Sequence, residues 1–131
     1  MNDIPLYAAS IAIAVLLAGI ACFQVLLFLG FPMAEYSWGG RHRGVLPNRL
    51  RRMSLLSAFV LVTMGLVFLV HARVLDIGAA LPTQGFVWAI TGLLGLNTLG
   101  NLASQSVKEK RVMTPLSGTA FAACLFVALN A

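Results

Sequence analysis

The sequence predicts an all-α fold: an integral membrane four-helix bundle with up-down topology, in a single domain covering residues 1–131. Two observations lead to this prediction. Of the 131 residues, 60% are hydrophobic and only 10% are charged, whereas soluble domains have about 45–50% and 25%. The apolar residues also gather in four long runs that lack the alternation of barrel strands, which excludes a sheet.

The first run, residues 6–31, carries no charge and is long enough to cross a hydrocarbon core of about 30 Å with some tilt. Pro32 follows it, and because proline cannot continue a helix, we expect Pro32 to end this one. The residues before the run include an acid and no base, and the run is too long for the apolar part of a signal peptide. We therefore expect it to be a spanning helix of the mature protein.

The other three runs are residues 54–71, 84–102 and 114–130. Before the second, Pro47 and Asn48 are expected to begin a short interfacial segment that leads into the span. The fourth run opens with Thr114-Pro115, a capping hydroxyl followed by proline at the first helical position, where a missing N–H costs nothing. Each run is expected to form one membrane-spanning helix.

The cations orient the predicted bundle. The first connection holds Arg41, Arg43, Arg49, Arg51 and Arg52, and the third holds Lys108, Lys110 and Arg111. An up-down bundle places both connections on one side of the membrane, which the positive-inside rule makes cytoplasmic. We expect a multi-pass protein of the bacterial inner membrane, with its N- and C-termini outside.

The net charge of +5 also bears on partners. Cations beside apolar runs are typical of contacts with anionic lipid headgroups, whereas nucleic-acid binding needs a basic patch on a soluble surface. Membrane lipids are therefore the expected partners, with a homo-oligomer as a further possibility, and nucleic acid is not expected. The residues expected to meet headgroups are Arg49, Arg51, Arg52, Lys108, Lys110 and Arg111.

Three amide side chains lie within the predicted spans: Gln24, Asn97 and Asn101. Polar groups in lipid are costly and often functional. At 1.5 Å per residue, Gln24 lies about 8 Å past the middle of its span and Asn97 about 6 Å past the middle of its own. The two helices run in opposite directions, so both amides fall in the cytoplasmic half. They form either a ligand site or interhelical hydrogen bonds that hold the bundle together.

The first cytoplasmic connection supplies a second group of candidates: Glu35, Tyr36, Trp38 and Arg41. One interpretation makes them a wall of a site for a headgroup or metabolite. The other makes them a folded loop anchored in the lipid interface, where Tyr and Trp are common. Glu35 is expected to pair with Arg41 or with an arginine ahead of the second span.

Redox and metal chemistry have no support in the sequence. Cys22 and Cys124 lie inside apolar runs and form no CxxC motif, so both are interpreted as packing residues. His42 and His71 are predicted to lie at opposite membrane faces and cannot share a metal. No catalytic residue, metal or cofactor is predicted.

Three stretches carry a resemblance: residues 30–40, residues 95–98 with Asn101, and residues 108–116. They resemble a family of small bacterial four-span integral membrane proteins to which no activity is assigned. The similarity covers nearly the whole chain. It implies a membrane location and this topology, and it implies no catalytic residue.

Three functions follow from these features. The favoured one is a bundle that binds a lipid, another small ligand or a partner helix through its cytoplasmic half. The second is a small oligomeric transporter or channel. The third is a membrane-embedded enzyme that acts on a lipid-soluble substrate, with Glu35 or His42 transferring a proton.

Overall fold

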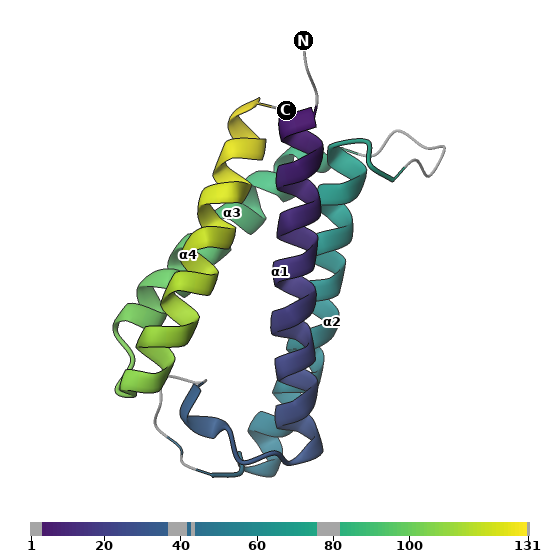
Figure 1. Cartoon of the computed structure of the whole chain (residues 1–131). Helices are drawn as coiled ribbons and strands as arrows, with labels where there is room; N and C mark the ends of the chain where they lie inside the picture. The colour runs from purple at the N-terminus through teal and green to yellow at the C-terminus, as the bar shows by residue number, and fades with distance from the viewer. Residues whose placement is uncertain (1–3, 37–41, 43, 76–81, 131) are drawn as a thin grey trace.

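The computed structural model describes residues 4–36, 42, 44–75 and 82–130. It contains α1 (Ile4–Leu29), the short 3-10 helix η1 (Ala34–Tyr36), α2 (Asn48–His71), α3 (Thr83–Leu102) and α4 (Val107–Asn130). No strand occurs among the described residues. The all-α fold class is confirmed: the chain is an up-down four-helix bundle (Figure 1).

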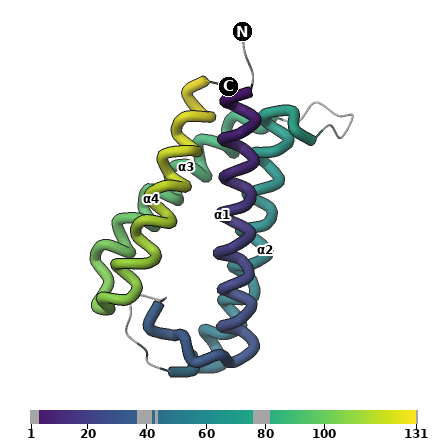
Figure 2. Tube along the Cα trace, viewed as in Figure 1, coloured from purple at the N-terminus to yellow at the C-terminus, as the bar shows by residue number. Residues whose placement is uncertain are grey.

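The bundle consists of two helical hairpins. Helix α1 packs mainly on α2, and α3 packs mainly on α4, while α1–α4 and α2–α3 form smaller contacts between the hairpins. Figure 2 shows the hairpins close together at the end where both termini lie and well apart at the other end. At that second end, η1 contacts α4, so the segment after α1 connects the separated hairpins.

The apolar core fills the end near the termini. Side chains from all four helices meet there, including Leu17, Phe68, Val87 and Val127, each of which is fully buried. A smaller cluster of Leu27, Ala34 and Leu46 closes the other end, beside η1. Between these two clusters the interior is more polar.

Large apolar side chains also cover the outside of the bundle, for example Val15, Phe59, Leu96 and Leu129. An outer surface of this kind is stable in hydrocarbon and would be an aggregation liability in water. Helices α1, α2 and α4 are long and apolar enough to cross a membrane. Together with the bundle architecture, this supports a membrane protein.

Helix α3 is not among the three apolar helices. Its 20 residues include two asparagines and Gln84, and these amides lower its mean hydropathy. The prediction that residues 84–102 cross the membrane therefore stays a prediction. A helix with polar groups is tolerated in lipid when those groups face other helices or a cavity.

The end of α1 differs from the prediction. The helix ends at Leu29, two residues before the expected limit, because Gly30 adopts a left-handed backbone with φ of 99°. The N–H groups of Gly30 and Phe31 donate to the carbonyls of Leu27 and Leu26, each at 3.2 Å. This is a Schellman motif, in which glycine rather than the following proline ends the helix.

Helix α2 begins at Asn48, directly after Pro47, as the sequence indicates. It then continues without a break to His71. The predicted interfacial segment and the second span are therefore one helix, and Arg49, Arg51 and Arg52 lie on its first turns.

The predicted start of α4 at Thr114 is wrong. The helix begins at Val107, and Pro115 lies inside it. The Thr114 hydroxyl caps nothing, since its oxygen is buried without a hydrogen-bond partner. Lys108, Lys110 and Arg111, expected in a loop, lie instead on the first turns of this helix.

Candidate functional site

A cavity of about 440 Å³ lies where the two hairpins separate, at the end opposite the termini. Helices α1, α2, α3 and α4 and η1 all contribute to its wall. The lining residues are Ile20, Phe23, Gln24, Tyr36, Ser57, Asn97, Gly100, Asn101, Glu109, Met113 and Ser117. Four of the predicted site residues, Gln24, Tyr36, Asn97 and Asn101, therefore meet at one cavity.

Asn101 is the structural member of this set. It is buried, and its amide nitrogen donates to Ser117 Oγ on α4 at 2.9 Å and to the Met113 carbonyl at 3.3 Å. The Ser117 hydroxyl in turn donates to the Met113 carbonyl at 2.7 Å. Asn101 therefore joins α3 to α4, as Asn often does between membrane helices.

The other two amides have no such role. The Gln24 Oε1 atom is buried and has no hydrogen-bond partner among the described residues. Asn97 is exposed, one helical turn before Asn101, at the edge of the cavity. An amide that the fold leaves without a partner remains available to a ligand, because buried polar groups are nearly always hydrogen-bonded.

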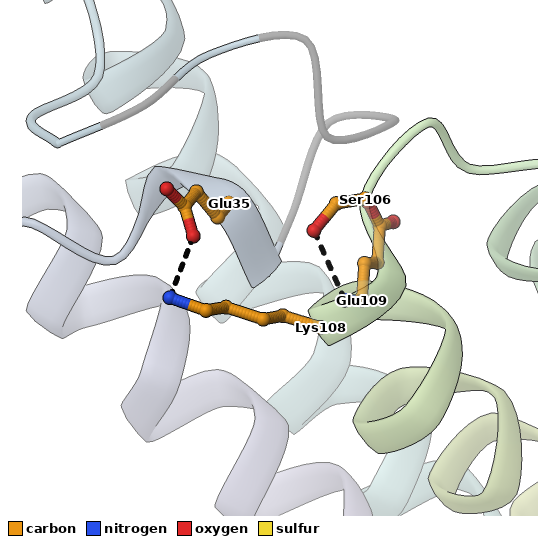
Figure 3. A network of polar contacts seen from close by, with 4 residues as sticks. All are labelled: Glu35, Ser106, Lys108 and Glu109. Carbon is orange, nitrogen blue, oxygen red and sulfur yellow. Dashed lines mark hydrogen bonds and ion pairs between the residues drawn. The ribbon is translucent and has the colours of Figure 1, made fainter.

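The segment after α1 closes one side of the cavity. Glu35 Oε2 forms an ion pair with Lys108 Nζ of α4 at 2.7 Å (Figure 3). The same Lys108 Nζ lies 5.8 Å from the centre of the Tyr36 ring. The Tyr36 ring meets Phe23 of α1 edge to face, with centroids 6.5 Å apart. These contacts connect η1 to both hairpins.

Glu35 was expected to pair with Arg41 or with an arginine ahead of the second span, which stays a prediction; in the described part of the chain it forms an ion pair with Lys108. This lysine had been assigned to lipid headgroups. It comes from a distant part of the chain, so local spacing could not indicate it. The two remaining candidates of this loop, Trp38 and Arg41, lie outside the described residues.

Glu109 is a site residue that the sequence analysis missed. It is only 4% exposed, it lines the cavity, and its Oε2 accepts a hydrogen bond from Ser104 Oγ at 2.8 Å. Its backbone N–H donates to Ser106 Oγ at 3.4 Å, which caps the start of α4 (Figure 3). The spacing Ser106-x-x-Glu109 is that of a capping box, and this signal could have revealed it.

The remaining predicted headgroup ligands lie at this end of the bundle. Arg49, Arg52, Lys110 and Arg111 are exposed on the first turns of α2 and α4. Arg51 differs, because its Nε donates to the Phe28 carbonyl at 3.0 Å. Arg51 therefore supplies a hydrogen-bond donor to a carbonyl at the C-terminus of α1, where the last carbonyls lack partners within the helix.

Among the described residues, no group of three His, Cys, Asp or Glu side chains is placed to hold a metal ion. His71 lies at the opposite end of the bundle, where its Nδ1 shares a hydrogen bond of 2.7 Å with Thr83 Oγ1. It joins the end of α2 to the start of α3 and takes no part in the cavity.

No family model, curated protein or solved structure matches this chain. The lining of the cavity combines apolar and aromatic surface with amides, hydroxyls and one carboxylate. This mixture, in a cavity of a few hundred Å³, is typical of a site for a small molecule.

Proposed function

We propose that the protein is a non-catalytic membrane protein that binds an amphipathic ligand, drawn from the surrounding lipid, in the cavity between its hairpins. The observation that carries the proposal is the convergence of Gln24, Tyr36, Asn97 and Asn101, from three separate elements, on one cavity. Polar groups inside a membrane bundle are costly unless they have a function or a partner.

The position of the cavity supports an amphipathic ligand. It lies between an apolar core on one side and the basic turns of α2 and α4 on the other. A molecule bound there would place apolar groups toward the core and polar groups toward the charged end. In the proposed orientation this end faces the cytoplasm, as the positive-inside rule requires, and the termini face outward.

Binding fits the geometry better than catalysis. Glu35, a candidate for proton transfer, is held by Lys108 and is not part of the cavity lining. General acid–base catalysis needs a group positioned at the substrate. The carboxylate that does line the cavity, Glu109, is held by Ser104 at the start of α4.

A cavity-filling variant tests the proposal. Gly100 lines the cavity, and a Cβ atom added there would meet nothing within 4 Å. Gly100→Leu is therefore expected to occupy cavity space without displacing the backbone. Gly92→Leu is the matched control, because Gly92 lies on the same helix, also faces open space, and does not line the cavity.

The measurement is native mass spectrometry after gentle extraction from membranes. Wild type and Gly92→Leu should retain a bound molecule, and Gly100→Leu should lose at least about nine-tenths of it, a tenfold change in affinity. If wild type emerges empty, or if Gly100→Leu retains as much ligand as Gly92→Leu, the cavity is not the binding site.

A further inference from the structure

The carboxylate of Glu109 indicates which chemical class of ligand the cavity would bind. It is 4% exposed, it lines the cavity, and the side chain that bonds to it among the described residues is the neutral hydroxyl of Ser104. No ion pair with a described Lys, Arg or His involves it, and Lys108, its neighbour in sequence, pairs with Glu35. The start of α4 and the Ser104 hydroxyl stabilise this carboxylate in part, and a cation in the cavity would supply the full counter-charge that a buried carboxylate favours.

The hydrogen-bonding groups of the lining point the same way. The Asn101 amide nitrogen already donates to Ser117 and Met113, which leaves its carbonyl oxygen free to accept. The hydroxyls of Ser57 and Ser117 donate to carbonyls of their own helices at 2.9 and 2.7 Å. The Gln24 Oε1 atom is buried without a donor. The cavity therefore offers several acceptors, including the Glu109 carboxylate, beside the N–H donors of Gln24 and Asn97.

A primary ammonium group matches this lining, because it has three donors, no acceptor and a positive charge. The aromatic rings of Phe23 and Tyr36 also line the cavity, and the faces of aromatic rings attract cations. Lys108, above the Tyr36 ring, marks the edge of the cavity at the basic end. An anionic group attached to the ammonium would share Lys108 with Glu35 at that edge.

We propose that the ligand is a phospholipid whose headgroup ends in a primary ammonium, as in phosphatidylethanolamine. The ammonium lies between Glu109, Gln24 and Asn101, and the phosphate lies at the lysine edge of the cavity. This inference rests on the proposed function and specifies the headgroup that the cavity selects.

The test uses the full chain in nanodiscs that contain equal amounts of phosphatidylethanolamine, phosphatidylcholine and phosphatidylglycerol. Lipids retained after transfer to detergent are identified by native mass spectrometry. Wild type should retain the ethanolamine lipid about tenfold over each of the other two, because hydrogen bonds to a charged group are the strong ones. Phosphatidylcholine has the positive charge without N–H donors, and phosphatidylglycerol has neither.

Two variants test whether the charge of Glu109 causes the preference for the ethanolamine lipid. Glu109→Gln removes the charge and keeps the size of the side chain, so the preference should fall to about twofold or less. Ser106→Ala weakens the same helix start without changing a lining residue, and should keep the full preference. A comparison of the two separates loss of charge from loss of local stability.

The inference is overturned if wild type prefers phosphatidylglycerol or shows no preference, or if Glu109→Gln keeps the preference of wild type. In each case a lipid is still bound and the proposed function stands. A competition experiment with free ethanolamine tests for a water-soluble ligand. If millimolar ethanolamine displaces the lipid, the site is assigned to a soluble amine instead. If no lipid of any class is retained, the proposed function fails together with the inference.

Discussion

Two asparagines one turn apart on α3 illustrate how position decides the role of a side chain. Asn101 is buried and donates two hydrogen bonds to α4, while Asn97 is exposed and has none among the described residues. For both residues, the sequence is compatible with a ligand site and with interhelical hydrogen bonds. The structure divides them: Asn101 holds the helices together, and Asn97 is available at the cavity.

This division predicts different stabilities for two otherwise equivalent variants. Asn101→Ala removes both bonds to α4 and should lower the free energy of unfolding by about 1 kcal/mol, within the range for hydrogen bonds between membrane helices. Asn97→Ala removes no bond and should change it by less than about 0.5 kcal/mol. Reversible unfolding in detergent micelles measures both values. An Asn97→Ala variant less stable than Asn101→Ala would contradict the assigned roles.

At the scale of the elements, the main surprise is where α4 begins. A Thr-Pro pair is a good helix start, because proline lacks an N–H that the first turn does not use. Proline is also tolerated inside membrane helices, where other groups satisfy the freed carbonyl. Thr114-Pro115 alone cannot distinguish the two cases. Ser106 and Glu109 decide it, since their capping interactions start the helix at Val107.

The start of α4 can be tested with two cap variants. Ser106→Ala removes the acceptor of the Glu109 N–H and should cost about 1 kcal/mol of stability, as for other lost N-caps. Thr114→Ala removes a buried hydroxyl without a partner and should be neutral or stabilising. Thermal unfolding in detergent would rank the variants. If Thr114→Ala were the more destabilising, the helix would begin at Pro115 after all.

The sequence predicted those features that depend on one helix at a time. The shared depth of Gln24 and Asn97 followed from the fixed rise per residue and the alternating direction of the helices, and both side chains line the cavity. The pair of Glu35 with Lys108 and the place of Glu109 in the wall did not follow. Both depend on how α4 is rotated and placed against η1, which periodicity within one helix does not determine.

The whole molecule is asymmetric along its axis. Near the termini, the interior is a closed apolar core that includes Leu17, Phe68 and Val127. At the other end the hairpins separate (Figure 1), and the cavity lies there. A transporter would need polar groups along the whole length of the bundle, whereas a binding protein needs them at one end only. This distribution fits the proposed binding site, whose polar lining lies at the end away from the termini.

The orientation of the whole molecule gives the last prediction. In a background of Cys22→Ala and Cys124→Ala, one new cysteine is placed at an exposed site at each end, either Leu75→Cys after α2 or Gln105→Cys between α3 and α4. A membrane-impermeant maleimide should label Leu75→Cys in intact cells. It should label Gln105→Cys only after permeabilisation, because the arginines and lysines retain that end on the cytoplasmic side.

Permeabilised cells provide the control, since both cysteines should react there if both are accessible. Labelling of Gln105→Cys in intact cells would show that the bundle has the opposite orientation in the membrane. The cavity would then open toward the outer leaflet, and its ligand would have to come from the lipids of that leaflet. The cavity and its lining would be unchanged, so the cell-labelling result and the lipid-retention result test orientation and binding independently.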